Sequence, residues 1–120
     1  MSADNPLLKK SYSFGLEIVI LYQKLVKRER EYVLSKQLLK SGTSIGANIA
    51  EANGAISKGD FSAKISIAYK ESLETKYWLN LLRDSVYIES SEANTLIDNA
   101  DELSKIMFSI LKSTRIKKQD

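Results

Sequence analysis

The sequence predicts an all-α protein that folds as an up-down antiparallel four-helix bundle in a single domain. Apolar residues recur at alternating spacings of three and four along four segments, which places them on one helix face in each segment. The only proline is Pro6 and the chain has 5 glycines, so few residues interrupt long helices. A chain of 120 residues has the size of one domain and needs no disulfide to support its core. We expect helices over residues 10–28, 31–54, 60–87 and 90–113, with frayed polar ends at 1–9 and 114–120.

The first helix has more apolar surface than one core face requires. Its seam consists of Phe14, Ile18, Leu21 and Leu25. A second line lies about 100° further round the helix and comprises Gly15, Val19, Tyr22 and Val26, with Leu16 and Ile20 widening it. A helix that is apolar most of the way round is usually buried on several sides. The surplus indicates either a broad core face or a subunit interface.

The second helix combines a seam with a line of small residues. The seam contains Leu34, Leu38, Ser41, Ile45, Asn48 and Ala52. We place a turn near residues 28–31, because one helix through both segments would span ~40 residues, far above the usual length. Gly42, Gly46 and Ala50 lie four apart. Since each glycine inside a helix costs about 1 kcal/mol relative to alanine, we expect another backbone to approach this line closely, within the bundle or between bundles.

The third and fourth helices have the longest seams. These are Phe61, Ile65, Ala68, Ser72, Thr75, Leu79, Leu82 and Val86 in the third, and Ala93, Leu96, Ala100, Leu103, Met107 and Ile110 in the fourth. We expect Asp60 to cap the third helix and Ser90 or Ser91 to cap the fourth, since such side chains accept hydrogen bonds from free backbone N–H groups. The third helix also carries Ile67, Trp78 and Leu81 off its seam, and tryptophan is favoured at interfaces.

Polar residues occupy core-type positions in the bundle. Ser41, Asn48, Ser72 and Thr75 lie on the seams, and Glu51, Glu71 and Glu74 lie next to them. An unpaired buried polar group costs about 1–3 kcal/mol, so we expect hydrogen bonds across helices that set their register. The candidate polar network or interface is Ser41, Gly42, Gly46, Asn48, Glu51, Glu71, Glu74 and Trp78. A carboxylate-only Mg²⁺ or Mn²⁺ site is the alternative, but we predict no metal and no cofactor, because Glu71-x-x-Glu74 lacks the histidine of a di-iron motif.

The composition excludes several classes of function. The chain has no cysteine and no histidine, which removes disulfides, thiol nucleophiles, histidine triads and the commonest metal ligand. It shows neither a signal-peptide pattern nor an apolar run long enough for a membrane span. We therefore predict a cytoplasmic protein that is not an enzyme and has no membrane partner.

The net charge of +3 is unevenly distributed. Residues 1–40 carry 8 basic and 4 acidic side chains, residues 41–104 carry 5 and 10, and residues 105–120 carry 5 and 1. In an antiparallel bundle the start of the first helix lies beside the end of the fourth, so basic residues gather at the two ends. The candidate nucleic-acid contacts are Lys9, Lys10, Lys112, Arg115, Lys117 and Lys118 at one end, and Lys24, Lys27, Arg28, Arg30 and Lys36 at the other.

Two segments carry a resemblance to a known family. The runs QLLKSGTSIGANIAEA, from Gln37 to Ala52, and IAYKESLETKYWL, from Ile67 to Leu79, resemble the signature motifs of the bacterial four-helix-bundle proteins named for intervening sequences in 23S rRNA. The resemblance covers residues 12–111. It implies a ring-shaped homopentamer of up-down bundles and attributes no catalytic residues. The family also resembles the more basic accessory proteins of diversity-generating retroelements, which partner a reverse transcriptase and bind nucleic acid.

We consider three functions. The first is a homo-oligomer that binds RNA, DNA or a nucleic-acid enzyme through its basic regions, by phosphate contacts that weaken with salt. In the simpler alternative, the terminal lysines and arginines are only solvated or interact with helix C-terminal dipoles. The second function is a protein–protein scaffold that uses the region of Tyr77 and Trp78, or the pentamer face, and binds no nucleic acid. The third is an enzyme, for which the chain lacks a nucleophile, a base and metal ligands.

Overall fold

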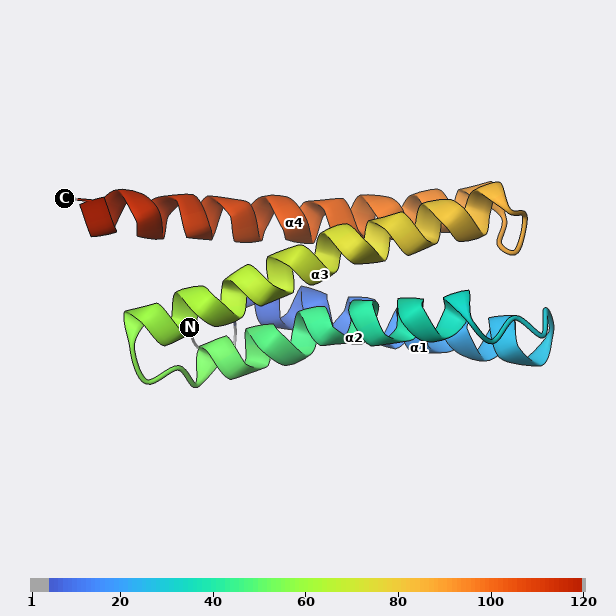
Figure 1. The fold of residues 1–120 in the computed structure, drawn as a ribbon, viewed down its shortest axis with the longest axis horizontal. Coiled ribbons are helices and arrows are strands. Elements are labelled where there is room, and N and C mark those ends of the chain that lie inside the picture. Colours follow the sequence, from blue (N-terminus) through green and yellow to red (C-terminus); the bar gives the residue numbers. More distant parts are fainter. Residues whose placement is uncertain (1–4, 120) are drawn as a thin grey trace.

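The computed structural model describes residues 5–119, with side chains as far as Thr114. Its four helices are α1 (Pro6–Lys27), α2 (Leu34–Asn53), α3 (Lys58–Asp84) and α4 (Ser90–Gln119). They alternate in direction around one core and form an elongated bundle of 51 × 22 × 22 Å, which confirms the predicted all-α four-helix bundle (Figure 1). The start of α1 and the end of α4 lie at the same end of the bundle (Figure 1). Contact between α1 and α4 is sparser than between the other neighbouring helices.

The first helix begins earlier than predicted. Asn5 caps it, because its side-chain oxygen accepts hydrogen bonds from the N–H groups of Leu7 at 2.8 Å and Leu8 at 3.4 Å. Pro6 fits the first position, where its missing N–H costs nothing. Leu7 is buried in the core, so the expectation of a frayed end is wrong for residues 6–9, and residues 1–4 lie outside the described residues. At the other end of the chain, α4 continues past the predicted boundary of 113 to Gln119.

The turn between α1 and α2 lies close to its predicted position, but α2 starts at Leu34 and not at residue 31. Glu31 has a different role, since its carboxylate accepts hydrogen bonds from the N–H groups of Val33, Leu34 and Ser35 at 3.1, 2.9 and 2.6 Å. Burial acts to raise the pKa of Glu31, but these backbone hydrogen bonds outweigh it and lower the pKa below its usual value. A buried carboxylate therefore caps α2.

The other two connections also differ from prediction. Ser57 caps α3 and accepts a hydrogen bond from the N–H of Asp60 at 3.0 Å, while Asp60 lies in the first turn and accepts one from the N–H of Ile56 at 3.3 Å. The predicted Asp60 cap is therefore wrong by one helical turn. α3 ends at Asp84, so Val86 leaves the predicted seam, has a positive φ of 66° and is 85% exposed. α4 begins at Ser90, which places Ser90 and Ser91 inside its first turn.

The seams form the core as predicted, and the glycines of α2 fit against α1. A side-chain Cβ at Gly42 would lie 2.9 Å from two carbons of the Ile18 side chain, and one at Gly46 would lie 3.2 Å from the backbone oxygen of Ser11. The expected close approach therefore occurs within the bundle, between α1 and α2. The apolar seam residues that are buried are Phe14, Ile18, Leu21, Leu25, Leu38, Ile45, Ala52, Ile65, Ala68, Leu79, Leu82, Ala93, Leu96, Ala100, Leu103 and Met107.

Within the described residues, no helix combines the length and the hydropathy that crossing a lipid bilayer requires.

Candidate functional surfaces

Two pairs of buried hydroxyl groups join the helices in the polar part of the core. Thr75 of α3 donates to the Ser41 hydroxyl of α2 at 3.0 Å, and the hydroxyls of Ser72 in α3 and Ser104 in α4 lie 2.7 Å apart. Thr75 and Ser104 also hydrogen-bond to backbone carbonyls of their own helices. Ser41, Ser72 and Thr75 therefore pair across helices as expected, whereas Ser104 was not predicted, because it lies one residue off the seam of its helix.

The other residues of the predicted network lie at the edge of the seams. The Asn48 side chain donates to the Ser44 carbonyl of its own helix at 2.9 Å. Glu51 is exposed and pairs with Lys64 of α3 at 3.1 Å, and Glu74 is exposed and accepts from the Trp78 indole at 3.2 Å. The prediction of a buried cross-helix network is therefore wrong for Asn48, Glu51 and Glu74, which water reaches.

Glu71 and Glu74 are the carboxylate pair that the sequence analysis considered as a metal site. Burial, and then the negative charge of Glu74, raise the pKa of Glu71, while the positive charge of Lys40 opposes this. A hard divalent ion takes at least six oxygen ligands. Among the described side chains no cluster of three or more acidic groups could hold a metal ion.

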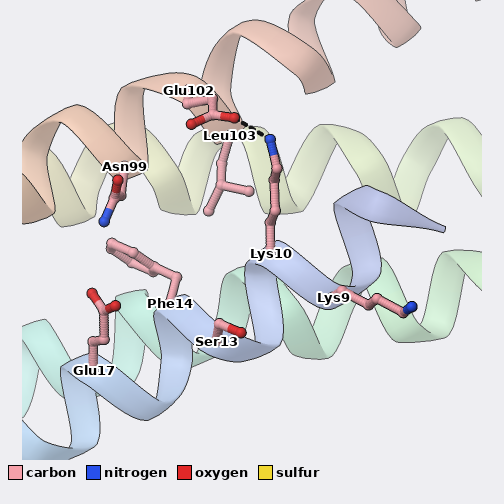
Figure 2. Close-up of a pocket in the computed structure, with 8 residues that line it drawn as sticks. All are labelled: Lys9, Lys10, Ser13, Phe14, Glu17, Asn99, Glu102 and Leu103. Atoms are coloured by element: carbon pink, nitrogen blue, oxygen red, sulfur yellow. Dashed lines mark hydrogen bonds and ion pairs between the residues drawn. The ribbon is translucent and has the colours of Figure 1, made fainter. Parts of the chain in front are cut away.

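Two of the predicted nucleic-acid contacts face acidic residues across the seam between α1 and α4. Lys10 pairs with Glu102, and Lys24 pairs with Glu92 at 3.0 Å. A cavity of about 330 Å³ lies along this seam beside the first pair. Figure 2 shows Lys10 reaching Glu102 across the seam, whereas the side chain of Lys9 points away from that pair. The surface between α1 and α4 therefore carries ion pairs and is not uniformly basic.

The remaining basic candidates lie at both ends of the bundle. Lys27, Arg28 and Arg30 are exposed around the α1–α2 turn, where a cavity of about 370 Å³ is also lined by Glu29, Glu89 and Glu92. Lys112 is exposed near the end of α4. The side chains of Arg115, Lys117 and Lys118 lie outside the described residues, although their backbone continues α4.

The outer surface of α1 exposes a line of large apolar side chains, which we name the α1 face. Tyr12, Leu16 and Ile20 lie four residues apart and are 69%, 50% and 58% exposed. The second apolar line of the sequence, with Val19 and Tyr22, is half-buried beside it. The α1 face contributes nothing to the core of this bundle, so the surplus apolar surface is not explained by a broad core face.

A second exposed surface lies between α3 and α4, and we name it the α3–α4 groove. It is a cavity of about 300 Å³ lined by Tyr69, Leu73, Lys76, Asp101, Ser104, Lys105 and Phe108. Phe108 is 52% exposed. Sequence reasoning missed this surface, because Phe108 lies beside the seam residue Met107 and gives no periodic signal of its own. The aromatic pair that the sequence did single out lies close by on α3, with the rings of Tyr77 and Trp78 in edge contact at 5.1 Å.

Known proteins share this sequence pattern and this fold. The sequence model of the 23S rRNA-intervening sequence protein family matches residues 3–109. A crystal structure from Bacteroides thetaiotaomicron, described as a protein with unknown function from the S23 ribosomal protein family, is 46% identical. The match covers 88% of this chain and 98% of that chain, with a TM-score of 0.87. No curated protein matches the chain.

Proposed function

The chain belongs to the family of 23S rRNA-intervening sequence proteins, and we propose that it is a cytoplasmic, non-enzymatic homo-oligomer that binds nucleic acid through the basic end of its bundle. The proposal joins two parts, self-assembly and binding of a polyanion. Each part is supported by a different surface.

The α1 face supports self-assembly. Leu16 and Ile20 are at least half exposed although the bundle already has a closed core. Contiguous exposed apolar surface on a small protein marks a site of interaction, and a second copy offers the same apolar chemistry. We propose a ring-shaped homopentamer as the assembly, because the family resemblance implies one.

The charge distribution along α4 is the observation that carries nucleic-acid binding. The acidic residues of α4 all precede Leu103, and its basic residues, Lys105, Lys112, Arg115, Lys117 and Lys118, all follow it. Lys10 and Lys24 already have acidic partners, so this end of α4 carries the proposal better than the α1–α4 seam. A cluster of lysine and arginine on one helix end is suited to phosphate contacts without base recognition.

A protein–protein scaffold is the competing proposal, and the exposed Tyr77 packed edge-on against Trp78 favours it. Aromatic side chains of this kind anchor protein interfaces. The two proposals differ in one measurable respect, since only the first requires a polyanion that salt releases.

The test is the native mass of the purified protein at low and at moderate salt, together with its absorbance ratio at 260 and 280 nm. We expect an oligomer with extra mass that salt and nuclease remove. In Lys117→Gln/Lys118→Gln the extra mass should be lost, whereas Lys40→Gln/Lys70→Gln, an equal charge change at exposed positions of α2 and α3, should keep it. An oligomer free of nucleic acid at low salt would favour the scaffold, and a monomer would refute self-assembly.

A further inference from the structure

The α3–α4 groove presents aromatic rings to solvent from two helices. The ring centroids of Tyr69 in α3 and Phe108 in α4 are 6.0 Å apart and their planes are tilted by 39°. Tyr69, Leu73 and Tyr77 lie four residues apart, so they form one line along α3. Tyr77 is 57% exposed. The groove therefore contains two aromatic rings, Tyr69 and Phe108, and a third exposed ring, Tyr77, continues their line along α3 beyond the groove lining.

Lysines flank these rings. Lys105 precedes Phe108 by three residues and Lys112 follows it by four, which places both on the same side of α4 as the ring. Lys76 of α3 and Lys105 each lie 3.0 Å from an oxygen of Asp101. Within the lining of the groove, one carboxylate between two ammonium groups leaves one net positive charge, while Asp98 and Glu102 lie beside Lys105 on its other side. The side chain of Lys105 remains 80% exposed. The groove is therefore apolar at its base and positively charged at its rim.

The base of the groove is held in place by the core. Ser104, which lines the groove, is buried and bound to Ser72 across the helix pair at 2.7 Å. Met107, the neighbour of Phe108, is fully buried, and Tyr69 packs against the core. A binding surface on two fixed helices loses little conformational freedom when a ligand is bound.

We propose that the α3–α4 groove binds single-stranded nucleic acid, with an unpaired base stacked on Phe108 and the adjacent phosphates on Lys105 and Lys112. Aromatic rings stack on any base whose face is free, and lysines track the strand between stacked bases. In a duplex each base face is covered by its neighbours, so the same rings have no partner there. The inference rests on the proposed nucleic-acid binding, and it adds both the class of strand and the face that receives it.

The test compares three labelled probes of the same sequence: single-stranded RNA, single-stranded DNA and duplex RNA. Each is ~12 nucleotides long, within the usual size range of single-strand binding sites. Fluorescence anisotropy gives each affinity at low salt. We expect Phe108→Ala to weaken binding of both single strands by about fivefold to about 150-fold, because that is the range for loss of one stacked base. Binding of the duplex should not change. Phe108→Tyr should keep the affinity, and Phe108→Leu, which retains apolar area but no ring, should lose it.

Tyr32→Ala is the matched control, because Tyr32 is an exposed aromatic residue in the α1–α2 turn, and it should leave all three affinities unchanged. If Phe108→Ala does not fold, Phe108→Leu provides the same comparison, because it removes the ring and keeps apolar area. Equal loss for single strands and duplex, or no loss, would overturn the inference. So would a fall in native mass in Phe108→Ala, since the groove would then be a contact between copies. If the wild-type chain binds nucleic acid and Phe108→Ala has no effect, the proposed function stands and only the groove is refuted. If the wild-type chain binds none of the probes, both are refuted.

Discussion

The α1 face and the α3–α4 groove both expose apolar side chains at a spacing of four residues, but their surroundings differ. On the α1 face, Leu16 and Ile20 are aliphatic, and the charged residues three before and four after Ile20, Glu17 and Lys24, are of opposite sign. In the groove, the exposed ring of Phe108 lies between Lys105 and Lys112. An aliphatic surface whose flanking charges balance loses little when a similar protein surface covers it, whereas burying two lysines against protein costs their hydration. Similar exposed apolar area therefore indicates two different partners.

The two surfaces also rest on different parts of the bundle. The α1 face belongs to a helix that fits closely against Gly42 and Gly46 of α2 but only loosely against α4. The groove lies between helices joined by the Ser72–Ser104 pair and by the ion pair of Lys76 and Asp101. Changes at the α1–α2 contact should therefore affect assembly before they affect the groove.

The largest expected effect is on assembly. Leu16→Glu/Ile20→Glu should reduce the native mass to that of one chain, 13.5 kDa, because two carboxylates would lose their hydration in a subunit contact. Far-UV circular dichroism should stay unchanged, since both side chains are exposed in the bundle. Ile56→Glu, at a position that is 93% exposed in the α2–α3 loop, should keep the native mass. An intact oligomer in the double variant would remove the α1 face as the interface.

The next effect concerns the turn that positions α1. Glu31→Gln should lower the free energy of unfolding by about 1–2 kcal/mol, as expected for loss of a buried helix cap. Because the pKa of Glu31 is lowered in the folded state, its contribution is present above the unfolded value of 4.5 and is lost as pH falls through the folded pKa. Urea unfolding between pH 3 and pH 7 should thus show less acid sensitivity in the variant.

Glu29→Gln, an exposed change in the same turn, is the control and should keep the acid sensitivity of the wild-type chain. If Glu31→Gln and the wild-type chain lost stability equally with acid, the cap would not be the source of this dependence.

A smaller effect separates the two sides of α1. In the monomeric Leu16→Glu/Ile20→Glu background, Gly15→Ala should raise the free energy of unfolding by about 0.5–1 kcal/mol, because alanine favours the helix and no other atom lies within 4 Å of the new Cβ. Gly42→Ala is the matched substitution on α2, and its Cβ would lie 2.9 Å from the Ile18 side chain. It should show no such gain. Equal gains in thermal or urea unfolding would mean that α1 and α2 are not closely fitted.

The smallest expected effect tests the charge of the groove. Asp101→Asn should release Lys76 and Lys105 and strengthen binding of single-stranded RNA by about two- to threefold at low salt, an effect that moderate salt should abolish. Stability should change little, since exposed ion pairs contribute ~0–1 kcal/mol. Glu17→Gln, the same change of charge on α1, should leave the affinity unchanged. A weaker complex in Asp101→Asn would show that the carboxylate organises the site and does not merely neutralise it.

Helix boundaries show where local reasoning was insufficient. The alternating spacing predicted the seams of all four helices, including fully buried Ile18, Ile45 and Leu79. The starts of α1, α2 and α3 were displaced because Asn5, Glu31 and Ser57 supply the caps. Several residue types can cap a helix, and a carboxylate such as Glu31 does so only where the chain folds back over it. Seam spacing therefore predicts the middle of a helix better than its ends.

Residue spacing and composition alone established four helices, their core faces and the loss of cysteine and histidine chemistry, because these are properties of neighbouring residues or of a simple count. The packing of the helices settled which polar groups meet: Ser72 with Ser104, Lys10 with Glu102, and Tyr69 with Phe108. These partners are distant in sequence, and the stagger and rotation of one helix against the next determine whether they touch. The α3–α4 groove lies on such a pair, Tyr69 with Phe108.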